Sequence, residues 1–227
     1  MNIGFLMDPL SKIHTHKDTT FAMLLASQQR GFKNSVMMPE DIWLQNGIAW
    51  GRMQSITVYD DLAHPFDLGE STEAPLADLD VLLMRKDPPI TMDYIYLTQL
   101  LEIAESQGLR VINKPSSLRD VNEKLFTAWF PQCCPKTMVT SQKELILDFA
   151  DSVERAVIKP LDNMGGTSVF QLSLDDHVIL CHYQYSFLQN KRPRKFAVGK
   201  NLWQQQFADD CLMDGTHSGW RIYHHRL

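Results

Sequence analysis

Short apolar runs that each end at a proline or a polar residue constrain the fold of this chain more than any other feature of its sequence. Four of them are expected to be buried strands: residues 2–7, 35–38, 80–84 and 111–113. Apolar residues at helical spacing lie between these runs, first from Asp18, an expected N-cap, to Gly31, and again over 94–105 before Gly108. Strands that alternate with helices predict an α/β fold with a mostly parallel sheet.

The rest of the chain gives a second set of elements. Residues 40–74 show no regular pattern apart from a possible strand at 56–59. We place a domain boundary near residue 120. Beyond it, the pattern predicts a helix over 122–130 capped by Asp120 or Asn122, a strand at 137–140 and a helix capped by Ser141. A hairpin of strands at 156–159 and 168–172 is expected to follow.

Polar and charged residues follow three of the expected parallel strands. Asp8 comes after the first strand, Arg85 and Asp87 come after the third, and Asn113 ends the fourth. The carboxyl ends of parallel strands meet at one rim of a sheet, where ligands bind. Cations beside a carboxylate suit a zwitterionic substrate that bears a carboxylate of its own. A solvated turn is the alternative interpretation of the same residues.

The loop inside the predicted hairpin is rich in glycine and follows a lysine. Lys159 ends the first strand, and Asp162, Gly165 and Gly166 lie in the loop. Glycines let backbone N–H groups approach a phosphate closely, and a buried lysine at a strand end requires an anion. No Gly-Lys-Ser/Thr follows, which excludes a Walker A loop. We interpret the segment as a nucleotide-phosphate lid, with a plain hairpin turn as the alternative.

Charge and cysteine content exclude several classes of protein. The chain has 22 Lys and Arg against 27 Asp and Glu, and a net charge of −5 argues against nucleic-acid binding. No apolar run reaches the roughly 18–20 residues of a membrane span. The start of the chain turns acidic too early for a signal peptide, and the four cysteines form no CxxC pair. We therefore expect a cytoplasmic protein with neither a membrane nor a nucleic acid as partner.

Three longer segments give a more specific indication, because all of them resemble one family. Residues 113–130, NKPSSLRDVNEKLFTAWF, closely resemble the segment that joins the two domains of bacterial glutathione synthetases. Residues 84–89 look like the MRKDPP turn of that family. Residues 157–166 are similar to its IKPLDGMGG lid, with Asn163 where the family usually has glycine. The resemblance covers the chain from residue 1 to about 174.

The resemblance implies a mostly parallel-sheet substrate-binding domain over 1–120 and an incomplete ATP-grasp domain over 121–174. It also implies an ATP-dependent carboxylate–amine ligase. ATP would phosphorylate a carboxylate of γ-glutamylcysteine, and the amine of glycine would then displace phosphate to give glutathione and leave ADP. The implied partners are ATP, γ-glutamylcysteine and glycine, with Mg²⁺ or Mn²⁺ as the metal and a possible homo-oligomer as the assembly.

The same resemblance gives roles to individual positions, although it singles out no catalytic residue. The residues that it implies in ATP binding are Lys124, Lys159, Asp162, Gly165 and Gly166. Those that it implies in binding the peptide substrate are Asp8, Arg85, Asp87 and Asn113.

The composition changes after residue 175. Residues 176–227 hold seven Lys and Arg, four Asp and no Glu, so their charge is +3, whereas the preceding 15 Lys and Arg and 23 Asp and Glu give −8. The late Glu and Asn ligands that the family uses for Mg²⁺ are absent, and histidines do not replace them. We therefore predict no metal ligand, and we interpret 175–227 as an unmatched, frameshifted tail of a truncated and impaired enzyme.

Other interpretations of the tail and of the whole chain remain open. Cys181, His182, Cys211 and His217 would be the ligands of a zinc site, but their spacing fits no standard finger. The basic run at 191–195 resembles a basic patch and is more often a surface charge run. The chain as a whole would otherwise be a non-catalytic binding or oligomerisation module, or an ATP-grasp ligase for a different acid.

Overall fold

The computed structural model describes residues 1–153, 156–161, 169–172 and 196–200. These residues belong to two compact units, of which the first includes Met1–Phe126 and the second includes Thr127–Leu161 and the strands described after it. Each unit is built on its own β-sheet.

The first unit has a seven-stranded sheet in the order β3-β4-β2-β1-β6-β7, with β5 paired to β4. Strands β1, β2, β6 and β7 are parallel to one another, whereas β3, β4 and β5 join through antiparallel pairs. This arrangement confirms the predicted α/β class. The strands are β1 (Asn2–Met7), β2 (Lys33–Met37), β3 (Ile42–Gln45), β4 (Ile48–Val58), β5 (Phe66–Pro75), β6 (Val81–Arg85) and β7 (Arg110–Ile112).

The prediction of an irregular segment over 40–74 is wrong, because that segment contains β3, β4 and β5. Asn46 and Gly47 have φ values of 52° and 79°, so they form the tight turn that joins β3 to β4. Strand β5 is exposed along most of its length and therefore carries no alternation of apolar and polar residues. Its backbone pairs with β4 nonetheless, which only the assembled sheet reveals.

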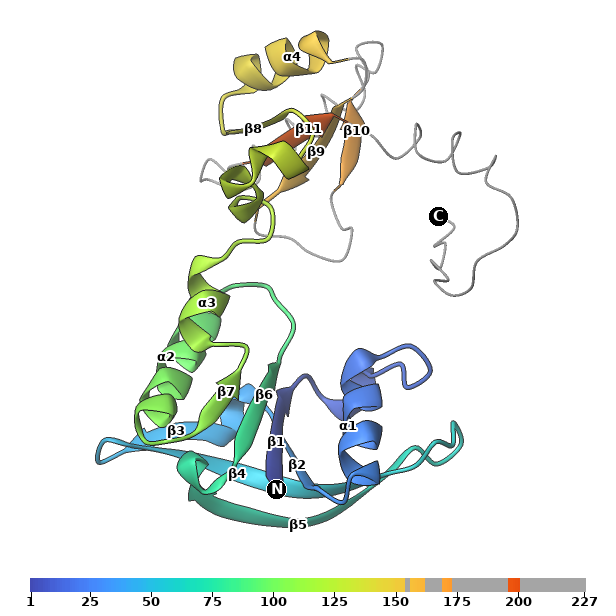
Figure 1. Ribbon diagram of the computed structural model, residues 1–227, viewed down its shortest axis with the longest axis vertical. Coiled ribbons are helices and arrows are strands. Elements are labelled where there is room, and N and C mark those ends of the chain that lie inside the picture. Colours follow the sequence, from blue (N-terminus) through green and yellow to red (C-terminus); the bar gives the residue numbers. More distant parts are fainter. Residues whose placement is uncertain (154–155, 162–168, 173–195, 201–227) are drawn as a thin grey trace. The chain divides into compact units, whose positions relative to one another are not determined.

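Helices cover both faces of this sheet (Figure 1). Helix α1 (Thr19–Gln29) packs over β1 and β2 in one apolar cluster that includes Phe5 and Leu24. Helix α2 (Met92–Ser106) packs on the opposite face in a second cluster that includes Leu82 and Leu101. The predicted cap of α1 is confirmed, since Asp18 Oδ1 accepts hydrogen bonds from the backbone N–H of Thr20 and Phe21 at 2.7 and 3.1 Å.

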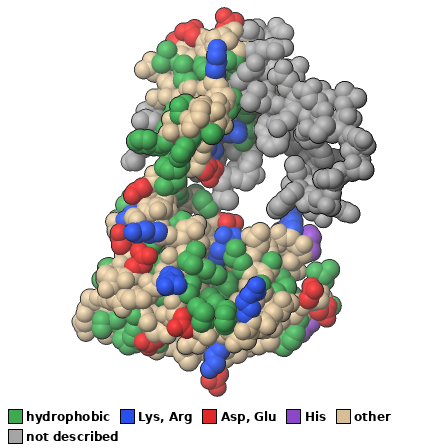
Figure 2. Space-filling view, viewed as in Figure 1, with side chains coloured by type: hydrophobic (Ala, Val, Ile, Leu, Met, Phe, Trp, Pro, Cys, Tyr) green, Lys and Arg blue, Asp and Glu red, His purple; other side chains and the backbone are tan. Residues whose placement is uncertain are grey.

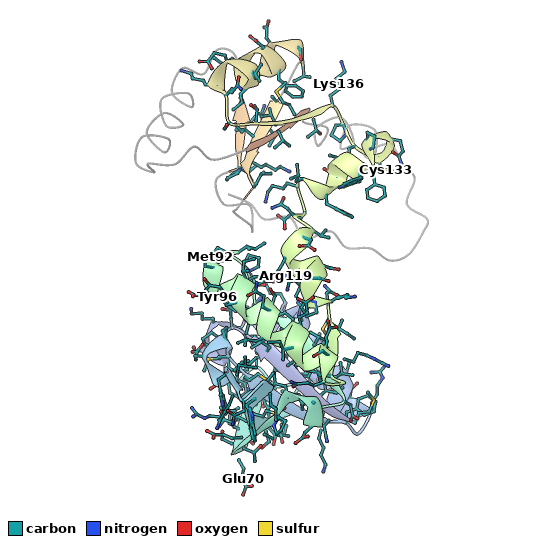
Figure 3. All side chains as sticks on the ribbon, turned by 90° about the vertical axis from the view of Figure 1, so that its left-hand side faces the viewer. Glu70, Met92, Tyr96, Arg119, Cys133 and Lys136 are labelled. Carbon is teal, nitrogen blue, oxygen red and sulfur yellow. The ribbon has the colours of Figure 1, made fainter. Side chains whose placement is uncertain are left out.

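A short helix, α3 (Pro115–Asp120), follows β7 and lies against α2. Arg119 of α3 donates to Glu102 Oε2 at 2.7 Å and to Thr98 Oγ1 at 3.4 Å, and both acceptors belong to α2. Figure 3 shows Arg119 beside the helix that carries Met92 and Tyr96. This ion pair ties the segment after β7 to the body of the first unit.

The helix predicted over 122–130 is wrong in kind. Asn122 does cap the segment, because its side chain accepts from the N–H groups of Lys124 and Leu125 at 3.0 and 3.1 Å. The chain then forms a turn and a 3₁₀ helix at Phe126–Trp129, and not an α-helix. Trp129 is 77% exposed, so no buried apolar face stabilises a longer helix here.

The second unit has a four-stranded sheet in the order β10-β9-β11-β8, with antiparallel neighbours throughout the described pairs. Its elements are β8 (Thr137–Thr140), α4 (Lys143–Ser152), β9 (Ala156–Pro160), β10 (Phe170–Leu172) and β11 (Phe196–Lys200). The hairpin of β9 and β10 agrees with the sequence pattern. Ser141 is not the cap of α4, because Gln142 holds the N-cap position and caps with no side-chain bond.

Part of the segment interpreted as an unmatched tail is structured, because Phe196–Lys200 form strand β11. Strand β11 pairs with β8 on one side and with β9 on the other, so it lies inside the sheet. Val198 is fully buried and packs with Ile146 of α4 and Ile158 of β9. A central strand satisfies the backbone groups of both neighbours, which is the physical reason why this stretch is ordered.

Candidate functional site

A cleft of about 430 Å³ opens at the carboxyl ends of β1 and β6 in the first unit. The turns after the two strands and the start of α1 form its walls. The lining residues are Met7, Asp8, Lys12, Ile13, Lys17, Asp18, Thr19, Thr20, Arg85, Asp87 and Pro88. Asp8, Arg85 and Asp87 therefore meet in one cleft, as their positions after parallel strands predicted.

The guanidinium of Arg85 is held by two hydroxyls. Its Nε donates to Thr20 Oγ1 at 3.1 Å, and its Nη2 donates to Thr19 Oγ1 at 2.9 Å. Both threonines belong to the first turn of α1, and Arg85 is the last residue of β6. The side chain is thus fixed between a helix start and a strand end that lie far apart in the sequence.

Asp8, at the end of β1, forms an ion pair and a hydrogen bond with the turn after β6. Its Oδ1 pairs with Lys86 Nζ at 3.0 Å, and its Oδ2 accepts from the backbone N–H of Asp87 at 3.0 Å. Lys86 Nζ also donates to the carbonyl oxygen of Asp87 at 2.6 Å. Both carboxylate oxygens of Asp8 thus have protein partners, which favours a structural role for Asp8 beside its predicted role in substrate binding.

The lining carries equal numbers of opposite charges. Lys12, Lys17 and Arg85 are its cations, and Asp8, Asp18 and Asp87 are its carboxylates. Two of the carboxylates are engaged, Asp18 as the cap of α1 and Asp8 in the turn after β6. On the visible face of the molecule, acidic and basic side chains are likewise interspersed (Figure 2). A cleft of this kind suits a zwitterion with more negative than positive groups.

Sequence reasoning missed the contribution of the segment before α1. Lys12, Lys17, Thr19 and Thr20 line the cleft but were not among the predicted site residues. The available signal was the presence of two lysines and two histidines between the end of β1 and a capped helix. The carboxyl end of a parallel strand is a ligand-binding edge, so such residues have functional meaning there.

Asn113 stands apart from the other predicted peptide-binding residues. Asn113 is exposed and follows β7 directly. Since β7 pairs in parallel with β6, Asn113 lies at the same rim of the sheet as Arg85. It is not among the described residues that line the cleft. Its predicted role in substrate binding therefore stays a prediction.

The residues predicted to bind ATP lie in different parts of the chain. Lys124 belongs to the first unit, where its side chain is 13% exposed and its Nζ pairs with Glu123 Oε1 at 2.8 Å. Lys159 belongs to the second unit and lies on β9. Asp162, Gly165 and Gly166 lie outside the described residues.

Lys159 lies on one particular face of the second sheet. Along β9, Ala156, Ile158 and Pro160 are buried, whereas Val157 and Lys159 are half-buried. Alternate residues of a strand point to opposite faces, so Lys159 lies on the face away from α4. The burial pattern thus places its ammonium outside the apolar core, in accord with a role in binding.

Metal binding finds no support among the described residues. The part of the chain that the structure describes contains no group of three or more His, Cys, Asp or Glu side chains that could hold a metal ion. The four residues of the alternative zinc site, Cys181, His182, Cys211 and His217, lie outside the described ranges. In the described ranges, no helix is long and apolar enough to cross a membrane.

Tyr94 makes the stability of the first unit sensitive to alkaline pH. Burial raises the pKa of Tyr94 above its ordinary value, and the negative charge of Asp87 raises it further. The pKa of Tyr94 in the folded protein therefore exceeds its value of about 10 in the unfolded chain. The contribution of Tyr94 to the free energy of unfolding is complete below about pH 10 and is lost as the pH rises through the folded-state pKa.

We expect Tyr94→Phe to reduce the loss of unfolding free energy between pH 9 and pH 11. Urea denaturation at a series of pH values between 9 and 11 measures the free energy of unfolding. Tyr96→Phe is the control, because Tyr96 is 54% exposed. An unchanged pH slope in Tyr94→Phe would contradict the prediction.

Family models match both units of the chain. "Prokaryotic glutathione synthetase, N-terminal domain" matches residues 1–119, and "Prokaryotic glutathione synthetase, ATP-grasp domain" matches residues 123–195. A glutathione synthetase of Coxiella burnetii is 54% identical over 176 residues, which are 78% of this chain and 55% of that protein. One of Shewanella oneidensis is 48% identical over 176 residues, with coverage of 78% and 56%. The chain spans about half the length of the curated relatives it matches.

Solved ATP-grasp structures share the fold. A RimK domain ATP-grasp protein from Sphaerobacter thermophilus has a TM-score of 0.53 at 18% identity, and the match covers 88% of this chain and 64% of that one. D-cycloserine synthetase DcsG has a TM-score of 0.55 at 13% identity, with coverage of 88% and 59%. These likenesses concern the fold alone, and it is the family model matched to residues 123–195 that identifies part of an ATP-grasp domain. The first family model alone covers more than half of the chain, and the chain therefore belongs to the prokaryotic glutathione synthetase family.

Proposed function

We propose that the chain is an ATP-dependent carboxylate–amine ligase that joins γ-glutamylcysteine to glycine and forms glutathione, ADP and phosphate. The family membership and the cleft at the carboxyl ends of β1 and β6 support this proposal together. The first unit would bind the peptide, and the second would bind ATP through Lys159 and the loop that holds Asp162, Gly165 and Gly166. Lys124 would add a further cation for the nucleotide phosphates.

The chemistry explains why both units are needed. A carboxylate is a poor electrophile, because an attacking amine would have to displace one of its oxygens as O²⁻, a very poor leaving group. Transfer of the terminal phosphoryl group of ATP to that oxygen gives an acyl phosphate and ADP. The glycine amine then attacks the acyl carbon, the carbon–oxygen bond to phosphate breaks, and the amine loses a proton. Lysine side chains beside the phosphates would offset the negative charge in the transfer.

The charge pattern of the cleft is the observation that supports the proposed binding of the peptide by the first unit. γ-Glutamylcysteine has two carboxylates and one ammonium group at neutral pH. Arg85 and the lysines at positions 12 and 17 match the carboxylates, and Asp87 matches the ammonium. Asp8 would hold the turn that carries Arg85 and Asp87, and Asn113 at the neighbouring strand end would extend the binding edge.

Titration calorimetry with the purified full chain tests the binding step. We expect γ-glutamylcysteine to bind with one-to-one stoichiometry, and the analogue with a carboxamide in place of the cysteine carboxylate to bind at least about tenfold more weakly, since a charge-assisted pair is lost. Equal binding of both compounds would refute the assignment. Tighter binding of a different acid would favour another carboxylate–amine ligase.

We further propose that the chain by itself turns over slowly and acts mainly as the peptide-binding part of a ligase. No Glu follows Glu154 in the sequence, although the family places late Glu and Asn ligands for its metal in the ATP-grasp domain. A coupled assay of ADP release with γ-glutamylcysteine and glycine measures the turnover. A rate in the ordinary range of enzymes, about 1–10³ s⁻¹, would exclude the binding-module interpretation. A cytoplasmic location and assembly into a homo-oligomer belong to the same proposal.

A further inference from the structure

The two threonines at the start of α1 have a specific relation to the substrate-binding arginine. The hydroxyls of Thr19 and Thr20 accept from Nη2 and Nε of Arg85. These two nitrogens share one edge of the planar guanidinium group. Thr20 lines the cleft but is only 5% exposed, so its hydroxyl has little access to water.

The occupied edge determines which donors face a ligand. A guanidinium group has five N–H donors in a rigid fork. The threonines occupy the edge of the guanidinium formed by Nε and Nη2. The other edge, formed by Nη1 and the second proton of Nη2, can bind a carboxylate through two parallel hydrogen bonds. We infer that Thr19 and Thr20 are positioning residues that present this edge of Arg85 to one carboxylate of the peptide substrate. This inference rests on the proposed function.

The local structure makes the threonines rigid supports. Threonine is branched at Cβ and has a restricted χ1 angle. Both residues belong to the first turn of α1, whose backbone is held by the cap at Asp18. A long arginine side chain that is already held loses less conformational freedom when it binds a ligand. The pair thus raises affinity without any need for Thr20 to touch the ligand.

A purely structural role of the same bonds, in which they only join β6 to α1, predicts a different result. In that case a variant of Thr20 would change the stability of the fold but not the affinity of a folded protein. The effect of such a variant on stability would disappear when Arg85 no longer has a guanidinium group, because the bonds would already be absent.

The test uses Thr20→Val, which keeps the shape and removes the acceptor, and Thr20→Ser, which keeps the acceptor. We expect Thr20→Val to raise the Kd for γ-glutamylcysteine by about 5- to 10-fold, the effect of one hydrogen bond, and Thr20→Ser to stay within about twofold. Thr98→Val is the matched control, because Thr98 is fully buried and its hydroxyl lies on α2, outside the lining of the cleft. In the Arg85→Ala background, Thr20→Val is expected to have no further effect on Kd.

A Kd unchanged in Thr20→Val, or an equal loss of affinity in the Arg85→Ala background, would overturn the inference. The ¹⁵N spectrum of the Arg85 Nε–H group provides a readout that needs no peptide. We expect slow proton exchange of this group in the wild type and in Thr20→Ser, and fast exchange in Thr20→Val. If the wild type failed to bind γ-glutamylcysteine while this exchange pattern held, the proposed function would fall and the positioning of Arg85 would stand. Fast exchange in the wild type would refute the positioning itself.

Discussion

Replacement of Arg85 by alanine is expected to weaken the binding of γ-glutamylcysteine by about 2–4 kcal/mol, or roughly 30- to 900-fold. The guanidinium is held by Thr19 and Thr20 at the wall of the cleft, so it meets a carboxylate with little loss of conformational freedom. Its removal also leaves two lysines against three carboxylates in the lining of the cleft, which opposes the binding of a peptide with two carboxylates. Titration calorimetry on the full chain measures the change.

Arg110→Ala is the matched control for this experiment. Arg110 is exposed and begins β7, so it lies at the amino end of a parallel strand, opposite to the rim that carries Arg85. Its loss removes the same charge from the protein without a change at the cleft. A similar fall in affinity in both variants would show that net charge, and not the position of Arg85, governs binding. Arg85→Lys is expected to recover only part of the affinity, since an ammonium group cannot form two parallel bonds.

Leu82→Ala is expected to lower the free energy of unfolding by about 2–5 kcal/mol, the cost of a cavity at a well-packed leucine. Leu82 lies on β6, is fully buried and belongs to the core cluster between the sheet and α2. The same strand ends at Arg85, so its packing also fixes the turn at the cleft. Urea denaturation followed by circular dichroism measures the loss.

Leu62→Ala provides the comparison for the core variant. Leu62 is 73% exposed, so its truncation is expected to change the free energy of unfolding by no more than about 0.5 kcal/mol. A loss below about 1 kcal/mol in Leu82→Ala would mean that the core relaxes around the cavity. In that case the position of the turn after β6 would not depend on the packing of Leu82.

The elements that sequence patterns predicted well are those with one buried face or two. Strand β1 was predicted with its observed bounds, and the cap at Asp18 was predicted from residue type and position. Strand β5 was missed because it is exposed along most of its length, and β11 was missed because a five-residue strand in an unusual tail has no local signal. Apolar periodicity reports burial, so a strand that buries little side chain is invisible to it.

The candidate site shows the same division. The sequence placed Asp8, Arg85 and Asp87 after parallel strands, and that alone predicted that they share a rim. It did not indicate that Asp8 bonds to the backbone of Asp87, 79 residues later, or that Thr20 receives Arg85 across 65 residues. These contacts depend on strand order and register.

The sequence by itself determined the α/β class, the family and the rim at which Asp8, Arg85 and Asp87 gather, because hydrophobic periodicity, capping and motif spacing are local properties of the chain. The tertiary structure decided that the hydroxyls of Thr19 and Thr20 bind Arg85 and that the carboxylate of Asp8 bonds to the turn after β6. It also decided which part of the tail forms a strand. Such contacts form between residues that are distant in sequence, and their geometry follows from how strands pair and helices pack. Local patterns carry no record of that pairing.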